Sequence, residues 1–273
     1  MLRSVSTSTP ASDLPQADAS TLVDRAELER QVQEMYRSVA DDPLASRHFE
    51  TGRPIALHLG YPASLLAAVP AAALASFAGV GYHFDLAALE HGERVLDLGS
   101  GSGTDVFCAA AGVGETGHVV GVDFTDAQLA RSRSLAAQLG IANVEFVEAS
   151  IDRLPLEDAS FDVVISNGVI NLSPVKDRVF AEAARVLRPG GRLAISDIVS
   201  AKPLKEATRR NTELWAACIA GAIPTVDYLD VLVASGFAVT SMRRNDYRFA
   251  SDRAVQACRT YGVESTSIAA VRR

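Results

Sequence analysis

The sequence predicts an α/β fold in which helices cover both faces of a doubly wound, mostly parallel β-sheet. Two observations support this prediction: apolar segments of strand length alternate with segments of helical pattern, and a glycine-rich turn directly follows the first of these strands. Alternating strands and helices imply right-handed crossovers between parallel strands. Ligands of such sheets bind beyond the carboxyl ends of the strands. The residues that follow each predicted strand are therefore the candidates for a functional site.

The first predicted strand, Val95–Leu98, ends in a glycine-rich loop. Gly99, Gly101 and Gly103 follow it and precede an apolar helical pattern. Glycines let the backbone come close to a ligand, because they have no Cβ and readily adopt positive φ. The spacing is G-x-G-x-G rather than the dinucleotide fingerprint G-x-G-x-x-G, and Asp97 suits a cationic or hydrogen-bond-donating ligand better than a phosphate. The loop resembles motif I of the class I methyltransferases, which bind S-adenosylmethionine; a tight turn without a ligand is the alternative.

The second predicted strand, His118–Asp123, ends in an acid about 20 residues past the glycines. A carboxylate at this position accepts hydrogen bonds from the ribose hydroxyls of an adenosine. NAD and S-adenosylmethionine share this contact, so Asp123 alone does not distinguish them, although the glycine spacing argues against an NAD-dependent reductase. The alternative role of Asp123 is to cap the helix that begins near Thr125.

Three further segments complete the predicted sheet. Asn143–Val147 suggests a third strand, and in methyltransferases the residues just past this strand contact the adenine ring, a position held here by Ser150 and Ile151. Phe161–Asn167 is a fourth strand, whose apolar run is consistent with burial on both faces. Val186–Leu193 resembles the helix–turn–strand signature that precedes the fifth strand of this superfamily. The resemblance implies a Rossmann-like sheet of seven strands.

The composition narrows the kinds of partner. The chain has 273 residues and a formal net charge of −7, and it contains no cluster of Lys and Arg, which disfavours nucleic acid as a ligand. Cys108, Cys218 and Cys258 have no paired spacing, so neither a disulfide framework nor a zinc site is indicated. No cluster of Asp, Glu and His suggests another metal. We expect a cytoplasmic monomer or homodimer that acts on a small molecule.

The chain before the glycine loop is predicted to add a lid to the sheet domain. Residues 1–20 are rich in Ser, Thr, Ala and Pro, which predicts a disordered tail rather than a signal peptide. Residues 21–40 carry apolar side chains at helical spacing. Residues 54–84 contain no Asp, Glu, Lys or Arg, but prolines and glycines interrupt the run, so no membrane span of about 20 apolar residues forms. We expect residues 21–90 to form a helical lid over the domain of residues 91–273; an oligomer interface or a membrane-surface patch is the alternative.

From about Gln31 onward, the chain resembles the bacterial arsenite methyltransferases. The resemblance depends on four segments, of which the third is specific, because most class I methyltransferases lack its Val-Ile-Asn-Leu string. The segments are Val95–Gly103, Gly121–Thr125, Val164–Ser173 and Leu214–Ala222. The resemblance implies S-adenosylmethionine as the methyl donor, and trivalent arsenic bound by cysteine thiolates as the acceptor.

The thiols that this resemblance implies are mostly missing. The family carries cysteines at the positions of Val80 and Gly168, and its more N-terminal cysteine has no counterpart, because no cysteine precedes Cys108. Only Cys218 matches a family thiol. A thiophilic centre needs two or three converging thiolates, so we expect the acceptor to be a small organic molecule, such as a specialised metabolite. An arsenical methyltransferase with a degenerate thiol site and a non-catalytic S-adenosylmethionine-binding protein are the alternatives.

The expected site has three sets of residues. The cofactor set consists of Asp97, Gly99, Ser100, Gly101, Gly103, Thr104, Asp123, Phe124, Ser150, Ile151 and Asn167. The acceptor set consists of Tyr36, Tyr61, Tyr82, Asn171 and Trp215. The catalytic candidates are His48, His83 and Asn167, and a general base is needed only when the acceptor must lose a proton. The alternatives are an ordinary surface or lid histidine, an asparagine that holds loop backbone, and a tryptophan of the core.

Overall fold

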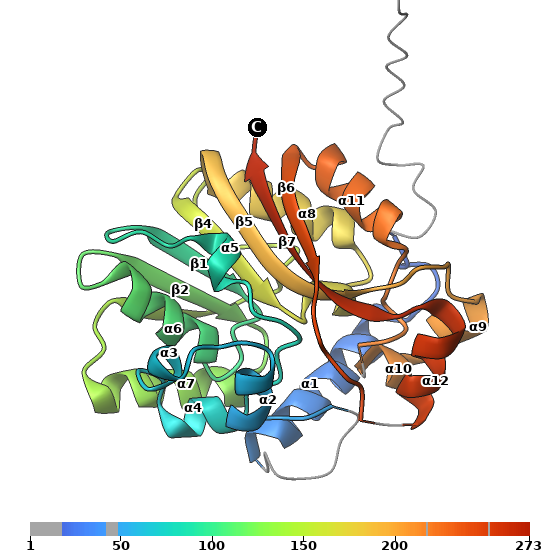
Figure 1. Cartoon of the computed structure of the whole chain (residues 1–273), viewed down its shortest axis with the longest axis horizontal. Coiled ribbons are helices and arrows are strands. Elements are labelled where there is room, and N and C mark those ends of the chain that lie inside the picture. Colours follow the sequence, from blue (N-terminus) through green and yellow to red (C-terminus); the bar gives the residue numbers. More distant parts are fainter. Residues whose placement is uncertain (1–17, 42–48, 217, 251) are drawn as a thin grey trace, which may run out of the picture.

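A seven-stranded β-sheet forms the centre of the molecule, with helices on both of its faces (Figure 1). The computed structural model describes residues 18–41, 49–216, 218–250 and 252–273. The strand order across the sheet is β3-β2-β1-β4-β5-β7-β6. The strands are β1 (Arg94–Leu98), β2 (His118–Asp123), β3 (Val144–Glu148), β4 (Phe161–Asn167), β5 (Leu187–Val199), β6 (Phe237–Arg244) and β7 (Glu264–Arg272).

The first five strands run parallel, and β7 lies antiparallel between β5 and β6. The strand order reverses between β1 and β4, and the carboxyl ends at such a reversal border the crevice in which α/β sheets bind ligands. The prediction of a doubly wound, mostly parallel sheet of seven strands is confirmed. The second and fourth strands have the predicted bounds, and the third lies one residue later than predicted.

Side chains alternate between the two faces of the sheet, and each face has its own apolar core. The helices packed on the sheet are α6 (Thr104–Val113), α7 (Asp126–Leu139), α8 (Lys176–Val186) and α11 (Thr225–Ala234). Leu96 belongs to the core shared with α8 and α11, whereas its neighbour Val95 belongs to the core shared with α6 and α7. Burial on both faces explains why the strands read as continuous apolar runs.

In the described ranges 18–41 and 49–93, five helices precede the sheet. They are α1 (Arg25–Asp41), α2 (Arg53–His58), α3 (Ala63–Leu66), α4 (Ala71–Ala75) and α5 (Phe84–Ala87). The prolines that interrupt the uncharged run lie where its helices begin: Pro54 lies in the first turn of α2, and Pro62 and Pro70 immediately precede α3 and α4. In Figure 1, α1 lies below the sheet, and it packs against α7 and α10 (Thr212–Ala216).

A third apolar core joins α1 to the C-terminal part of the chain. It includes Leu28, Val32 and Trp215, with contributions from α12 (Asp252–Tyr261). The remaining short elements are η2 (Ile170–Leu172) and α9 (Glu206–Arg209). No helix in the described part of the chain is long and apolar enough to cross a membrane. The predictions of a cytoplasmic location and of a monomer or homodimer stay predictions.

The predicted disordered tail lies mainly outside the described residues, which begin at position 18. Its last residues are placed: Asp18 forms an isolated β-bridge with Val175, and the Ala19 amide donates to the carbonyl of Pro174 at 2.7 Å. These contacts attach the start of the described chain to the segment that follows β4. The boundaries predicted for the tail, the lid and the sheet domain stay predictions.

Candidate cofactor and acceptor site

A cavity of about 380 Å³ lies at the carboxyl ends of β1, β2, β3 and β4. One face of α1 forms its roof, through the residues Arg25, Leu28, Glu29, Val32, Gln33 and Tyr36. Residues between Ala73 and Gly79 close one side. Ten of the eleven predicted cofactor residues line the cavity, and the eleventh, Gly103, is the N-cap residue of α6.

The glycine loop makes room for a ligand at two positions. Gly101 has a φ of +53°, and a Cβ built on it would meet no protein atom within 4 Å, so this backbone faces open space in the cavity wall. Gly99 has a φ of +76°, and a Cβ there would lie 2.4 Å from a methyl group of Val169. The loop therefore needs glycine at position 99 to pack and at position 101 to leave the cavity open.

The acid that ends β2 holds the glycine loop. Asp123 accepts hydrogen bonds from the amide of Gly101 at 2.9 Å and from the amide of Thr125 at 2.8 Å. Burial raises the pKa of Asp123, and these amide hydrogen bonds counteract the rise. Asp123 does not cap α7, because the N-cap residue of that helix is Thr125, which makes no side-chain capping hydrogen bond. The Asp123 carboxylate also lines the cavity.

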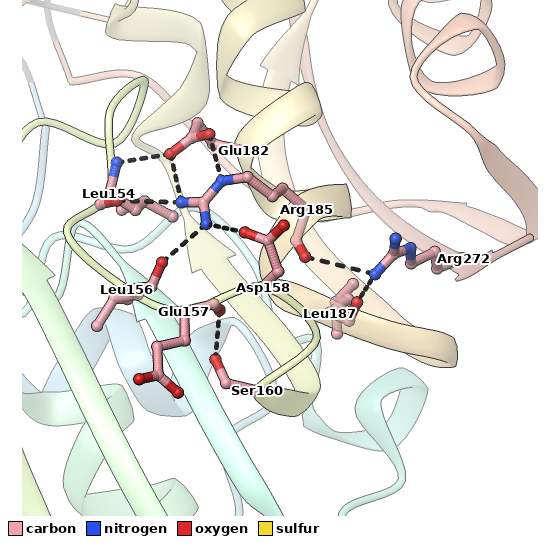
Figure 2. A network of polar contacts seen from close by, with 9 residues as sticks. All are labelled: Leu154, Leu156, Glu157, Asp158, Ser160, Glu182, Arg185, Leu187 and Arg272. Carbon is pink, nitrogen blue, oxygen red and sulfur yellow. Dashed lines mark hydrogen bonds and ion pairs between the residues drawn. The ribbon is translucent and has the colours of Figure 1, made fainter.

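The loop after β3 is fixed from two sides. From the roof, the Arg25 guanidinium donates to both carboxylate oxygens of Asp152, at 2.7 and 3.0 Å. From behind, Arg185 of α8 donates to the carbonyls of Leu154 and Leu156, at 3.0 and 2.8 Å, and forms an ion pair with Glu182 (Figure 2). Ser150 and Ile151 thus stand at the cavity on a loop with restrained backbone.

Asn167 connects the sheet to the segment before it. Its side-chain nitrogen lies within hydrogen-bonding distance of Tyr61 Oη (2.9 Å), the Gly81 carbonyl (3.0 Å) and Asp105 Oδ2 (3.1 Å). Its oxygen accepts from the amides of Val80 and Gly81, at 2.8 and 3.3 Å. The side chain is thereby used in holding backbone, which is the alternative role considered for it from the sequence.

Asp105 was not singled out from the sequence, although it lines the cavity. It lies in the first turn of α6, where it accepts hydrogen bonds from Tyr61 at 2.7 Å and from Asn167. A local signal existed, because Asp105 lies two residues past the last glycine of the loop, at the start of the predicted helix. Its partner Tyr61 gives no such signal, since it is 44 positions away.

The other predicted acceptor and catalytic residues lie in different places. Tyr36 lines the cavity, whereas Tyr61, Tyr82, Asn171 and Trp215 do not belong to its wall. Trp215 is buried, and its ring nitrogen donates to the Arg209 carbonyl at 2.6 Å. His83 is buried outside the wall, and neither ring nitrogen has a hydrogen-bond partner among the described residues. His48 lies outside the described residues.

Burial governs the chemistry of His83. The pKa of its imidazole is lowered chiefly by desolvation, which the nearby carboxyl groups of Asp105 and Asp85 only partly offset. A neutral imidazole stacked on Phe84 is a packing element of the segment before β1. In the described part of the chain, no group of three or more His, Cys, Asp or Glu side chains is arranged to hold a metal ion.

The three positions at which the arsenite methyltransferases were expected to carry cysteines converge in space. A Cβ on Gly168 would lie 3.1 Å from a methyl group of Val80, and the Cys218 thiol lies 3.8 Å from the Gly168 carbonyl. Cys218 also contacts the Tyr36 hydroxyl at 3.8 Å, and burial raises its thiol pKa to about 12. The Cys218 sulfur is therefore the one thiol among these three positions, and it lies next to the hydroxyl of Tyr36, a residue of the cavity wall.

The cavity fits a cationic adenosine ligand better than a phosphate. Its charged lining residues are six acids (Glu29, Asp97, Asp105, Asp123, Glu148 and Asp152) and one arginine, Arg25. Carboxylates favour a cation and oppose a phosphate. The open backbone at Gly101 and the acid at Asp123 match the cradle and the ribose acceptor of such a ligand.

Comparison with known proteins places the chain in a family. A methyltransferase-domain family model matches residues 89–252. An arsenite methyltransferase of Halobacterium salinarum is 43% identical over 188 residues, which cover 69% of this chain and 48% of the relative. The crystal structure of an arsenic(III) S-adenosylmethionine methyltransferase from Chlamydomonas reinhardtii matches with a TM-score of 0.65 and 34% identity, over 77% of this chain and 72% of the other.

A structure of geranyl diphosphate methyltransferase has the same fold, with a TM-score of 0.61 at 20% identity, over 90% of this chain and all of the other. The matched part spans about half the length of the curated arsenite methyltransferases. The family-model match covers more than half of the chain and includes the glycine loop, Asp123 and Asn167. The chain belongs to the class I S-adenosylmethionine-dependent methyltransferases and is related within them to the arsenite methyltransferases.

Proposed function

We propose that this chain transfers a methyl group from S-adenosylmethionine to a small acceptor by direct displacement. The observation that carries the proposal is the cavity wall in which the open backbone of Gly101 is hydrogen-bonded to the buried acid Asp123. When bound, S-adenosylmethionine supplies an electrophilic methyl group on a cationic sulfur. The protein's part in such a displacement is mainly to align the reactants and to exclude water.

The residues divide these tasks. Asp123 accepts from the ribose, Ser150 and Ile151 contact the adenine, and the acid wall around Asp97 faces the cationic end of the cofactor. The α1 helix acts as the lid that excludes water, because its apolar residues Leu28 and Val32 lie over the cavity. The side chain of Asn167 is hydrogen-bonded to the backbone of Val80 and Gly81, and its part is to hold the acceptor side of the cavity in place.

We propose a trivalent arsenical as the first acceptor to test. The names of the relatives support this choice, and Cys218 stands at the meeting point of the three expected thiol positions. One protein thiolate fills one of the three valences of arsenic, so methyl groups or small-molecule thiols must fill the other two. Such an acceptor also requires Cys218 to lose its proton and Tyr36 to move aside.

The second candidate is an organic acceptor, as expected from the sequence. The observation that favours it is that Val80 and Gly168, which stand at two of the expected thiol positions, have no side-chain sulfur to offer to arsenic. The apolar contact surface of Phe77, Val169 and Leu172 in the cavity wall suits an uncharged organic body. In that case Cys218 is a packing residue.

The two acceptors are separated by one assay with S-adenosylmethionine that carries a labelled methyl group. The purified protein is incubated with arsenite or a methylated trivalent arsenical, each with excess small-molecule thiol, and the methylated arsenic is measured. We expect Cys218→Ser to abolish this transfer and the matched thiol variant Cys258→Ser to retain it. Arsenic methylation that survives in Cys218→Ser contradicts the role of Cys218 as the arsenic ligand, and absence of arsenic methylation by the wild-type protein contradicts the arsenical proposal. Binding of S-adenosylmethionine without transfer to any acceptor supports a non-catalytic binding protein.

A further inference from the structure

Three buried carboxyl groups share the inner wall of the cavity. The side chains of Asp97, Asp105 and Asp123 belong to residues that are 2%, 5% and 8% exposed. Two of the three receive hydrogen bonds from the protein: Asp105 from Tyr61 and Asn167, and Asp123 from the amides of Gly101 and Thr125. For Asp123, these hydrogen bonds counteract the rise in pKa that burial causes.

Asp97 differs from its two neighbours. Throughout the described ranges, no N–H or O–H group donates a hydrogen bond to its carboxyl group. Among the described residues of the cavity wall, Arg25 is the one cationic side chain, and it is paired with Asp152 and Glu29. An ionised carboxylate without donors, buried beside two other acids, is unfavourable, and a protein relieves this by binding a proton.

We propose that Asp97 is protonated in the ligand-free protein and that binding of a cationic ligand in this cavity releases the proton to solvent. The proposal rests on the proposed function only in taking S-adenosylmethionine as that ligand. The O–H bond of the carboxyl group breaks, its electron pair stays on the carboxylate, and the carboxylate then faces the positive charge of the ligand. No covalent bond to the ligand forms.

The surroundings of Asp97 agree with a neutral carboxyl group. Burial raises its pKa well above the usual range, and the charges of Asp105 and Asp123 raise it further. The other titratable groups that face it are Tyr61, from the segment before the sheet, and Cys108 of α6; burial raises the pKa of both, so both stay neutral. His83, which faces Asp105, also stays neutral.

The expected pH dependence follows from this assignment. The carboxyl group binds its proton more tightly in the free protein than in the complex, so affinity for the cation rises with pH until Asp97 ionises in the free protein as well. At its steepest, the rise is about tenfold per pH unit for one proton. A ligand without positive charge gains nothing from the released proton, so Asp97 favours the cationic methyl donor over neutral adenosine compounds.

Titration calorimetry tests the proposal, because the measured heat then includes the ionisation enthalpy of the buffer. S-adenosylmethionine is titrated at one pH below 7, under the α-amino range of about 7.7–8.0, in two buffers of different ionisation enthalpy. We expect release of about one proton per ligand and none with 5′-methylthioadenosine, which carries no charge. S-adenosylhomocysteine keeps the ammonium and lacks the sulfonium, so a release with it assigns the ammonium, and no release assigns the sulfonium, as the partner of Asp97.

Two variants identify the group that gives up the proton. Asp97→Asn retains the shape of the side chain and cannot ionise, so we expect it to bind S-adenosylmethionine without proton release and with affinity that does not change between pH 5.5 and 7, roughly the range below the α-amino pKa. Asp123→Asn is the matched control, which should bind more weakly yet still release the proton. Thermal melting of both variants checks that they are folded.

The outcomes separate the two proposals. Binding of S-adenosylmethionine with equal heats in both buffers overturns the proton release. Loss of the release in Asp123→Asn with its retention in Asp97→Asn also overturns the assignment to Asp97. Failure of the wild-type protein to bind S-adenosylmethionine in any buffer overturns the proposed function instead.

Discussion

The proposed cofactor side and the proposed acceptor side of the cavity are built in different ways. On the cofactor side, the wall consists of residues that directly follow strands, such as Gly101, Asp123 and Ser150, and the sheet itself sets their positions. On the acceptor side, the wall is assembled from distant segments, and Tyr36 is held by a contact with Cys218, 182 positions away. The positions of the first group depend on local chain direction, whereas those of the second depend on contacts between segments that are distant in the sequence.

The comparison is tested most strongly by Gly101→Val. The new side chain would point into open space in the cavity, so we expect S-adenosylmethionine to bind about 100-fold more weakly or worse, a loss of about 2.8 kcal/mol. The positive φ of +53° adds a strain cost of about 1–2 kcal/mol to folding. Calorimetry measures the first effect and thermal unfolding the second.

The chain offers a matched control for this variant. Gly140 has a φ of +65°, and a Cβ there also meets no atom within 4 Å, but it ends α7 away from the cavity wall. Gly140→Val should therefore lose similar stability and retain full affinity for the cofactor. Equal loss of affinity in both variants would mean that the glycine loop is not the cradle.

The same contrast explains what could be predicted from the sequence. The fold and the cofactor wall were predictable, because strand periodicity and the residues just past each strand are local patterns, as at Asp97 and Asp123. The acceptor wall was not, because burial of Tyr61 and Trp215 depends on partners far away in the chain, Asp105 and the Arg209 carbonyl. An aromatic residue in an uncharged run does not reveal whether its polar end faces a ligand or a neighbouring side chain.

An intermediate effect is expected at Asn167, where the two sides meet. Asn167→Ala removes the hydrogen bonds to Tyr61, Asp105 and the backbone of residues 80–81, and leaves several buried polar groups without partners. We expect the free energy of unfolding to fall by about 2–3 kcal/mol. Denaturant titration measures this loss.

Asn143→Ala is the control for that experiment. Asn143 also holds backbone, with hydrogen bonds to the carbonyls of Ala110 and Gly114 at 3.2 and 2.9 Å, but it lies at the amino end of β3. We expect a cost of about 1 kcal/mol there. If Asn167→Ala costs no more than Asn143→Ala, the contacts of Asn167 do not hold the acceptor side to the sheet.

The smallest effect concerns the roof, which touches both sides because α1 carries Arg25, bonded to the loop after β3, and Tyr36, in contact with Cys218. The Arg25–Asp152 ion pair is partly exposed, so Arg25→Ala should change stability by less than about 1 kcal/mol. The Arg25→Ala protein should nevertheless release bound S-adenosylmethionine several-fold faster in stopped-flow displacement. The roof then lacks its ion pair with the loop after β3, where we propose that the adenine binds. Arg30→Ala is the control, since Arg30 lies on the same helix and pairs only with Glu27 and Glu34 among the described ion pairs. If both variants release the cofactor at the wild-type rate, α1 is a fixed wall of the acceptor side rather than a lid shared by the two.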